Sequence, residues 1–232
     1  FLGLYGACST AALGLGLGAM LLDGGFAGKV LTATVSHNST AERQYRFPTE
    51  YGAQRRPYQQ WTVTGAGAAL LGYDRSGPKI TAVTFGKVID LGSTDPLNMG
   101  AAMAPAAADT IRQHFQDTGW DPDAFDLIVT GDLGKIGLEL CRQELADSGL
   151  NLGDNFTDCG IIIYDLEKQD VHAGGSGCAA SALVTYGHLY KQLQRQTIRR
   201  LLLVGTGSLH STTSVQQGES IPCIAHAVRS EA

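Results

Sequence analysis

The segment FLGLYGACSTAALGLGLGAMLLDGG, residues 1–25, points to the fold class because it predicts a buried helix that starts at a cysteine. Leucine and methionine recur at helical spacing at positions 13, 17, 20 and 21. Ser9 or Thr10 is expected to cap the helix start, and Gly24–Gly25 to end it. Each glycine inside a helix costs about 1 kcal/mol relative to alanine. A helix that carries several of them is therefore expected to be the central helix of a layered fold, with other backbone close to it.

A targeting or membrane segment is the alternative interpretation, because residues 1–22 carry no charged side chain. A secretory signal peptide begins with a basic region, which is missing here. A lipoprotein signal has an aliphatic residue three positions before its cysteine, where this chain has Tyr5. A membrane helix needs about 20 strongly apolar residues, whereas glycines interrupt this segment repeatedly. We therefore expect no transmembrane helix.

Outward from this helix, β-rich and helical segments alternate, which is typical of a layered α/β fold. Residues 37–60 form a long polar loop of the kind that often covers a site. We expect 79–90 to return antiparallel to 61–72, and the helix 99–119 to be interrupted or to begin at Pro105. The predicted strands are 29–36, 61–72, 79–90, 127–131, 159–165, 199–209 and 221–230, and the further helices are 99–119, 135–149 and 174–198.

Two parts of the chain resemble each other. Gly6-Ala7-Cys8-Ser9-Thr10 and Gly175-Ser176-Gly177-Cys178-Ala179 are both turns of small residues. Each precedes a helix, then a strand, then a later β segment. The spacing of 170 residues between the two cysteines is too long for a solenoid. It predicts two similar α/β halves with one buried helix each, and chance similarity between Gly/Ala-rich turns is the alternative.

Composition excludes several functional classes. A net charge of −5 without a run of basic residues gives no support to nucleic-acid binding. The five cysteines form no CxxC pair and do not cluster with histidine, so neither a disulfide framework nor a structural zinc site is predicted. We therefore expect no nucleic-acid partner, no cofactor and no metal-ligating residues.

Several segments resemble the thiolase-like superfamily. YGACSTA (5–11) resembles the nucleophile turn of ketoacyl synthases and thiolases, and FDLIVTGD (125–132), AGGSGCAASA (173–182) and LLLVGTGSL (201–209) resemble three later segments of those enzymes. Within the superfamily the chain is similar to the stage V sporulation protein AD family of spore-forming bacteria. That similarity is carried by SHNSTAERQYRFPTEYGAQ (36–54), WTVTGAGAALL (61–71), TDPLNMGAAMAPAAADTI (94–111), FTDCGIIIYD (156–165) and IPCIAHAV (221–228).

The resemblance implies an α/β fold with thiolase-like α/β/α/β/α layers and two pseudo-repeated halves. Residues 1–98 would be the remainder of the first half, and residues 99–232 the second half. The chain starts at Phe1, and the nucleophile turn of a thiolase-like chain lies well inside it. We therefore expect the upstream part of the first half to be absent.

The chain departs from these enzymes at the partners of the nucleophile. Asp132 stands where the synthases have a histidine, and Gly175 stands where the enzymes have histidine or asparagine. A carboxylate beside a thiol raises the pKa of the thiol, and glycine has no side chain that can transfer a proton. We therefore predict a binding protein with no catalytic residue. An active thiolase or ketoacyl-synthase-type acyltransferase using Cys8 is the alternative, and a structural subunit with a vestigial pocket is a third interpretation.

The resemblance implies that the chain binds dipicolinic acid (pyridine-2,6-dicarboxylate), with or without calcium, for uptake into the developing spore. It further implies membrane-embedded sporulation transport proteins as partners, a homodimer with which TGAGAALL is compatible, and a location in the forespore or spore, either cytoplasmic or peripherally attached to the inner membrane. Lys87, Arg43 and Arg46 are candidate charge partners for an anion. The candidate ligand-binding residues are Cys8, Ser9, His37, Asp132, Gly175 and Ser176.

Overall fold

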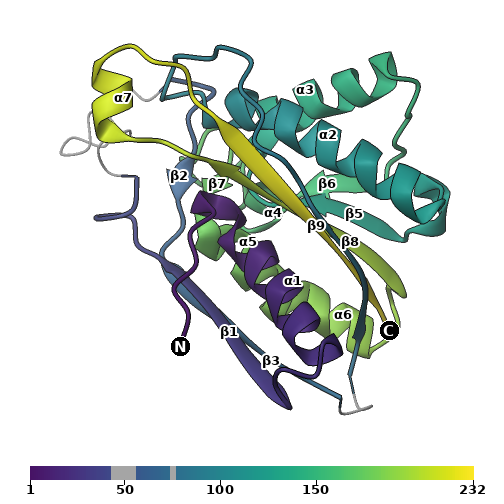
Figure 1. Ribbon diagram of the computed structural model, residues 1–232. Helices are drawn as coiled ribbons and strands as arrows, with labels where there is room; N and C mark the ends of the chain where they lie inside the picture. Colours follow the sequence, from purple (N-terminus) through teal and green to yellow (C-terminus); the bar gives the residue numbers. More distant parts are fainter. Residues whose placement is uncertain (43–55, 74–76) are drawn as a thin grey trace.

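A five-stranded mixed sheet forms the centre of the computed structural model, which describes residues 1–42, 56–73 and 77–232. Its strands stand in the order β4-β9-β8-β5-β6 (Figure 1). β9 runs antiparallel to both of its neighbours, and the other four strands run in one direction. The five strands are β4 (Lys79–Phe85), β5 (Leu127–Thr130), β6 (Phe156–Asp158), β8 (Arg200–Ser208) and β9 (Cys223–Glu231).

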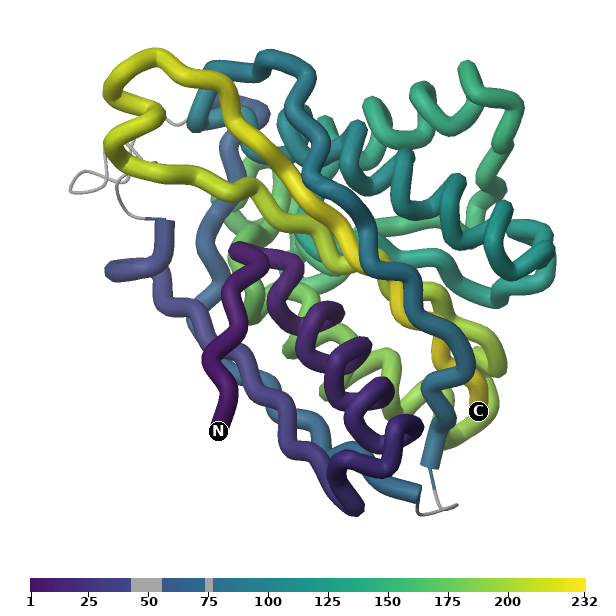
Figure 2. The backbone as a smooth tube through the Cα atoms, viewed as in Figure 1, coloured from purple at the N-terminus to yellow at the C-terminus, as the bar shows by residue number. Residues whose placement is uncertain are grey.

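Helices cover both faces of this sheet. α2 (Met99–Thr118) and α3 (Gly134–Asp147) pack on one face, and α1 (Thr10–Asp23) packs on the other with α5 (Cys178–Leu183) beside it (Figures 1 and 2). After α5 the chain continues as the π-helix η4 (Val184–Leu189) and then α6 (Tyr190–Gln194). Beyond α1 and α5 lies a second sheet, in which β1 (Lys29–Ser36) and β3 (Gly65–Gly72) pair antiparallel. The described residues thus form alternating layers of helices and sheets.

The composition of β8 explains its central place. Leu202 and Val204 belong to the core under α2, whereas Leu201 and Leu203 belong to the core under α1. All four side chains are at most 1% exposed. A strand buried on both faces is expected to be a continuous apolar run instead of an alternating one, and the sequence LLLVG is such a run.

The glycines of α1 allow the close approach that the sequence predicts. A Cβ atom added at Gly14 would lie 2.2 Å from Oγ1 of Thr32 in β1, and one added at Gly16 would lie 2.8 Å from a methyl group of Val83 in β4. Both distances are shorter than any real Cβ contact. α1 is therefore in contact with strands of both sheets, and its interior glycines are a packing requirement.

The internal repeat is confirmed by the topology. The turn at Cys8 opens α1, and the two β segments that follow it, β1 and β3, pair antiparallel. The turn at Cys178 opens α5, and the two strands that follow it, β8 and β9, also pair antiparallel. The division at residues 98 and 99 stays a prediction. β4 comes before it in the chain and is nevertheless part of the five-stranded sheet.

Several predicted elements differ from the structure. The segment 79–90 does not pair with 61–72, because β4 pairs with β9 and β3 pairs with β1. The predicted strand 61–72 is divided into β2 (Trp61–Thr62), which pairs parallel with β7 (Gly175–Ser176), and β3. The segment 159–165 is not a strand, since α4 (Cys159–Ile162) follows directly after β6. Pro105 lies inside α2 without interrupting it.

Three short helical elements complete the description: η1 (Ala7–Ser9), η3 (Pro122–Ala124) and α7 (Thr212–Gln216). α7 lies in a segment where neither a strand nor a helix is predicted from the sequence. Over the residues that the structure describes, no helix has both the length and the apolar character needed to cross a membrane.

Candidate functional site

A strained turn presents Cys8 at the start of α1. The backbone of Ala7 has φ of 49°, in the left-handed region that non-glycine residues rarely adopt. The Ser9 hydroxyl donates to the carbonyl oxygen of Gly6 at 2.6 Å and so closes the turn on itself. Gly207 of β8 lies directly beneath, where an added Cβ would be 2.3 Å from the Gly6 carbonyl oxygen. β8 therefore fixes the position of the turn, and Ser9 has a structural role in it.

Four side chains from distant parts of the chain meet at this turn; we call Cys8, Glu42, Asp132 and Ser176 the Cys8 cluster. The Cys8 thiol donates to Oε1 of Glu42 at 3.0 Å. The Ser176 hydroxyl lies 3.1 Å from Oδ2 of Asp132 and 3.2 Å from Oε2 of Glu42. The Thr62 hydroxyl donates to Oε2 of Glu42 at 2.8 Å. The start of α1 lies beside β2 and β7, which carry Thr62 and Ser176 (Figure 1).

Asp132 is held in place from three directions. The Thr206 hydroxyl donates to Oδ1 of Asp132 at 2.8 Å and accepts from the Asp132 backbone N–H at 3.0 Å. The Gly177 backbone N–H donates to Oδ2 at 2.9 Å. The Gln60 side-chain amide donates to the carbonyl oxygens of Asp132 and Gly175, at 2.7 and 2.8 Å. The carboxyl group thus has a fixed orientation, with Oδ2 toward the Ser176 hydroxyl.

The two carboxyl groups control protonation in the cluster. Burial raises the pKa of the Cys8 thiol well above its ordinary value, and the negative charges of Asp132 and Glu42 raise it further. Burial also raises the pKa of Asp132 to about 7, with repulsion from Glu42 as the next cause. A thiol is a nucleophile only as its thiolate. The cluster therefore keeps Cys8 neutral and gives it the role of a hydrogen-bond donor.

Ser176 links the two carboxyl groups. A hydroxyl group has one proton to donate, and the oxygen of Ser176 lies within hydrogen-bond distance of both Asp132 and Glu42. With Asp132 protonated, Asp132 donates to Ser176 and Ser176 donates to Glu42. In that state Cys8, Thr62 and Ser176 all donate to the carboxylate of Glu42.

The spacing of the cluster also resembles that of a metal site. Ligand atoms of Cys8, Glu42 and Asp132 all lie within 4.8 Å of one another. Calcium takes oxygen ligands, so the thiol is a poor ligand for it, and a zinc site would require the Cys8 thiolate. The hydrogen bond from Cys8 to Glu42 accounts for the short distance between them, and we assign no metal to these residues.

The structure brings together four of the six residues proposed from the sequence. Cys8, Asp132 and Ser176 belong to the cluster with their side chains, and Gly175 contributes the backbone carbonyl bound by Gln60. Ser9 is buried, and its hydroxyl is directed to Gly6 and not to the cluster. His37 is exposed, and Nδ1 of its ring lies 2.8 Å from the Ser39 hydroxyl. Among the described residues, the hydrogen bonds of the His37 ring go to Ser39 and not to the cluster.

Sequence reasoning missed Glu42, Thr62, Thr206 and Gln60. Glu42 and Gln60 lie in or at the end of a polar loop that has no periodicity. Thr206 had a usable signal, because it stands between two glycines at the end of a buried strand. Lys87, proposed as a charge partner, has its ammonium group 3.2 Å from Asp109, and its side chain is 68% exposed. Arg43 and Arg46 lie outside the described residues.

The buried histidines lie away from the cluster. Burial lowers the pKa of His114 to about 4, with the charge of Arg229 as the next cause, and its Nδ1 lies 2.9 Å from the Thr84 hydroxyl. His226 is stacked edge-on against Phe85. Neither of these two histidines is therefore placed to deprotonate Cys8.

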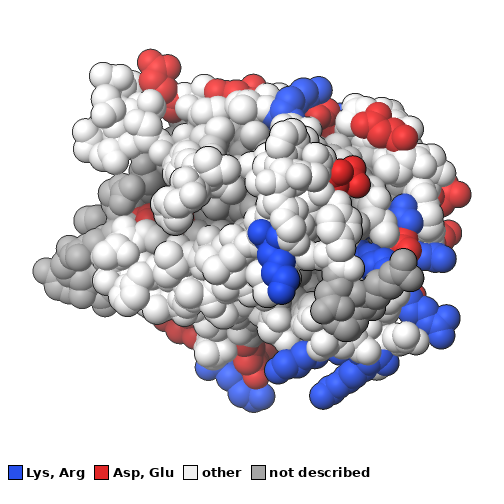
Figure 3. All heavy atoms as spheres, turned by 60° about the horizontal axis from the view of Figure 1, so that its bottom comes forward, with Lys and Arg blue, Asp and Glu red and all other residues white. Residues whose placement is uncertain are grey.

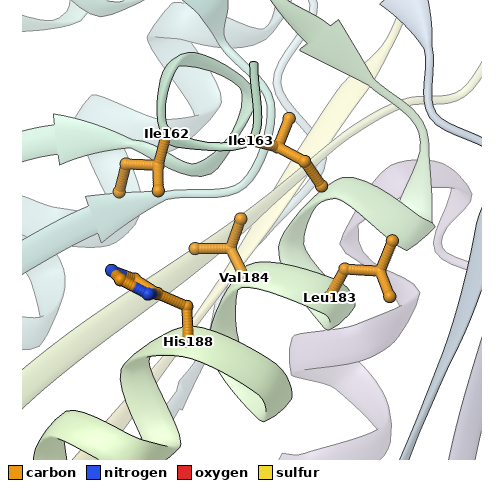
Figure 4. A pocket seen from close by; sticks show the side chains of 5 residues that line it. All are labelled: Ile162, Ile163, Leu183, Val184 and His188. Atoms are coloured by element: carbon orange, nitrogen blue, oxygen red, sulfur yellow. The ribbon is translucent and has the colours of Figure 1, made fainter. Parts of the chain in front are cut away.

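A hollow away from the cluster lies between α4 and the helices after Gly177. Figure 4 shows that its lining is apolar apart from His188. The lining residues are Ile162, Ile163, Leu183, Val184 and His188. Its polar group, the His188 ring, lies 2.7 Å from the side-chain amide of Gln192. A charged ligand finds few partners there, so the Cys8 cluster is the stronger candidate site.

Comparison with known proteins gives concordant results. The family model of stage V sporulation protein AD matches residues 1–231. The stage V sporulation protein AD of Bacillus subtilis (strain 168) is 51% identical over 228 residues, which cover 98% of this chain and 67% of that protein. The structure is similar to AbyA1, a tetronic acid condensing enzyme, with a TM-score of 0.58 at 17% identity over 99% of this chain and 67% of that one.

A similar match is found to the 3-oxoacyl-[acyl-carrier-protein] synthase III of Aquifex aeolicus VF5, with a TM-score of 0.59 at 12% identity. It covers 97% of this chain and 65% of that enzyme. The chain therefore has the thiolase-like fold of condensing enzymes. It spans about two thirds of the length of the proteins that it matches.

Proposed function

Because the chain belongs to the stage V sporulation protein AD family, we propose that its Cys8 cluster binds a small dicarboxylate, dipicolinic acid, without converting it chemically. The proposed ligand is either dipicolinate alone or its complex with calcium. The family name supports a role in sporulation. The identity of the ligand comes from the family resemblance, and the pocket supplies groups that suit it.

One observation carries the non-catalytic part of the proposal: Cys8 lies between two carboxyl groups and donates its proton to one of them. A condensing enzyme needs a base or positive charge that stabilises the thiolate. Asp132 and Glu42 have the opposite effect, because each raises the pKa of the thiol. The fold has thus kept the nucleophile turn while its surroundings suppress nucleophilic chemistry.

The pocket offers hydrogen-bond donors for a carboxylate ligand. The Cys8 thiol and the hydroxyls of Thr62 and Ser176 all point to one small volume. Asp132, with a pKa of about 7, adds an O–H donor when it is protonated. A planar dicarboxylate presents acceptor oxygens on one edge, which matches a set of converging donors.

Charge decides the form in which the ligand binds. Two unit charges at 4 Å interact by about 4 kcal/mol near a protein surface, so a free dianion beside ionised Glu42 and Asp132 is disfavoured. Protonation of Asp132 lowers this repulsion, and so does a calcium ion bound to the ligand. We therefore expect tighter binding with calcium, and tighter binding at pH 6 than at pH 8 in its absence.

The remaining parts of the proposal concern cellular context. The protein would act in the forespore or spore, in the cytoplasm or attached to the inner membrane, as a homodimer. Membrane-embedded sporulation transport proteins would be its partners in uptake. These statements rest on the family resemblance alone. Cross-linking in sporulating cells followed by identification of the partners tests them.

Isothermal titration with dipicolinate, with calcium and with a chelator, tests the ligand. We expect binding to the wild-type protein and about tenfold weaker binding to Ser176→Ala, since a hydrogen bond to a charged group contributes about 1.5–3 kcal/mol. Thr213→Ala, at an exposed position in α7, is the matched control and should bind normally. Absence of binding to the wild-type protein at millimolar ligand contradicts the proposal.

Mass spectrometry tests the enzymatic alternative. Incubation with an acyl-CoA should leave the mass of the protein unchanged if Cys8 is not a nucleophile. In an active acyltransferase the Cys8 sulfur would displace CoA and retain the acyl group as a thioester. A stable acyl adduct that is absent from Cys8→Ser would refute binding without turnover.

A further inference from the structure

A carboxylate already occupies the set of donors in the Cys8 cluster. The carboxylate of Glu42 accepts from the Cys8 thiol at 3.0 Å and from the Thr62 hydroxyl at 2.8 Å, and lies 3.2 Å from the Ser176 hydroxyl. The donors come from a helix start and from two paired strands, β2 and β7. The acceptor comes from a short turn that follows His37. The protein thus binds the Glu42 carboxylate as it would bind the carboxylate of a ligand.

We propose that Cys8, Thr62 and Ser176 form a carboxylate subsite, that Glu42 occupies it as an internal stand-in, and that a carboxylate ligand enters by displacing Glu42. This inference rests on the proposed function, and it names the group with which the ligand competes. The chemistry of recognition is the same in both states, because both occupants present carboxylate oxygens to the same three donors.

Electrostatic repulsion favours a ligand that displaces Glu42 over one that binds beside it. A ligand carboxylate that binds while Glu42 stays in place adds a third acidic group to Glu42 and Asp132 in a buried volume, where like charges disfavour each other. A ligand carboxylate that takes the place of the Glu42 carboxylate leaves one carboxylate at the three donors. Glu42 then leaves the pocket toward solvent.

The backbone is consistent with a removable occupant. Glu42 has φ of 61°, a left-handed conformation that a glutamate rarely adopts. The preceding turn residues Ser39 and Thr40 are exposed. The donors are fixed instead, since Cys8 is 6% exposed and Thr62 and Ser176 are fully buried. The three donors are thus held by the core independently of the turn that carries Glu42.

Titration of Glu42→Ala with calcium-free dipicolinate tests the inference. The apparent affinity of a site is reduced by the fraction of time in which it is available. If Glu42 leaves the donors free for about 10–30% of the time, its removal tightens binding by about threefold to tenfold. Glu42→Gln keeps the shape with weaker, neutral hydrogen bonds and should give an intermediate affinity. Ser39→Ala, at an exposed position in the same turn, should bind as the wild type does.

Alkylation of Cys8 by iodoacetamide provides a measurement that is independent of the ligand. Removal of Glu42 exposes the thiol and removes one charge that raises its pKa, so Glu42→Ala should react faster than the wild type. Equal or weaker dipicolinate binding by Glu42→Ala, with the wild type binding normally, overturns the inference. If neither protein binds, the proposed ligand is wrong, and an unchanged alkylation rate then overturns the stand-in role as well.

Discussion

Two glycines of β8 allow the turn that carries Cys8 to lie close to this strand. Gly205 and Gly207 flank Thr206, and a Cβ atom on them would meet Ala12 at 2.6 Å and the Gly6 carbonyl oxygen at 2.3 Å. The Cys8 turn can lie on β8 only because these side chains are missing. Thr206 points the other way and holds Asp132. A run of three residues therefore sets the distance between the thiol and the carboxyl group.

Gly207→Ala should displace the Cys8 turn, because the added methyl group collides with backbone and not with a movable side chain. Overpacking of this kind costs about 1–3 kcal/mol. We expect a lower free energy of unfolding in urea and loss of dipicolinate binding. Gly187→Ala is the control, since nothing lies within 4 Å of the added atom. That variant should be as stable as the wild type or up to about 1 kcal/mol more stable; equal effects of the two changes would disprove the packing argument.

At the scale of elements, Asp158 joins three segments of the second half. Its carboxyl group accepts from the Thr130 hydroxyl at 2.6 Å and from the backbone N–H groups of Leu133, Gly134 and Gly160 at 2.8, 3.0 and 2.9 Å. It therefore caps α4 and binds the turn between β5 and α3. This side chain explains why a sequence rich in isoleucine starts a helix at residue 159 instead of extending β6.

Asp158→Ala should destabilise the protein by at least about 3 kcal/mol, because it leaves several buried donors without an acceptor. Asp158→Asn keeps one acceptor oxygen and should lose less. Chemical denaturation monitored by circular dichroism measures both. Asp154→Ala, at an exposed position nearby, should be neutral. A loss below about 1 kcal/mol for Asp158→Ala would show that solvent or neighbouring groups satisfy the donors.

At the scale of the whole molecule, the sheet of β1 and β3 has an unusual orientation. Thr32, Thr34 and Ser36 of β1 face inward and are buried, whereas Leu31 and Val35 are 69% and 70% exposed. A sheet with one covered face normally has the opposite pattern. Figure 3, which brings the lower side of Figure 1 forward, shows uncharged residues over much of that side, with the Lys and Arg side chains mainly toward its right and lower edges. Exposed leucine and valine side chains such as those of β1 are typical of an interaction surface.

Buried titratable groups should make the stability of the whole fold depend on pH. Burial raises the pKa of Asp132 to about 7 and that of Asp158 to about 6, from 3.8 in the unfolded chain. At a pH between the unfolded and the folded pKa, the carboxyl group is protonated in the folded protein and ionised in the unfolded chain. Lowering the pH from about 8 to 6.5 therefore stabilises the fold. Below pH 6.5, His114 binds a proton in the unfolded chain but not in the folded protein, where its pKa is about 4. This difference lowers the free energy of unfolding and opposes the stabilisation by the two aspartates.

We expect the melting temperature to rise from about pH 8 to 6.5 and to level off between pH 6.5 and 6, where His114 offsets the gain from Asp132, and an Asp132→Asn variant to lose most of the rise. Differential scanning fluorimetry across this range measures both proteins. His114→Gln is the control for the acidic side: without the opposing histidine, the melting temperature should go on rising below pH 6.5. A wild-type melting temperature that decreases steadily from pH 8 to 6 would contradict the assigned pKa directions.

The sequence by itself determined the features that are encoded locally. The turn at Cys8, the glycine-rich helix after it, the family and the fold class all follow from short motifs. Asp132 and Ser176 were found because each lies in such a motif. The strand LLLVG was predictable because a short continuous apolar run is typical of a strand that is buried on both faces.

Only the tertiary structure decided which distant groups meet. Glu42 joins Cys8 across 34 positions and Ser176 across 134, and β4 pairs with β9 instead of β3. A polar loop residue has no periodicity that points to its partner, and a β segment does not specify its neighbour by its own sequence. The physical reason is that hydrogen-bond partners and strand neighbours are selected by the packing of α1 between the two sheets, which no local segment contains.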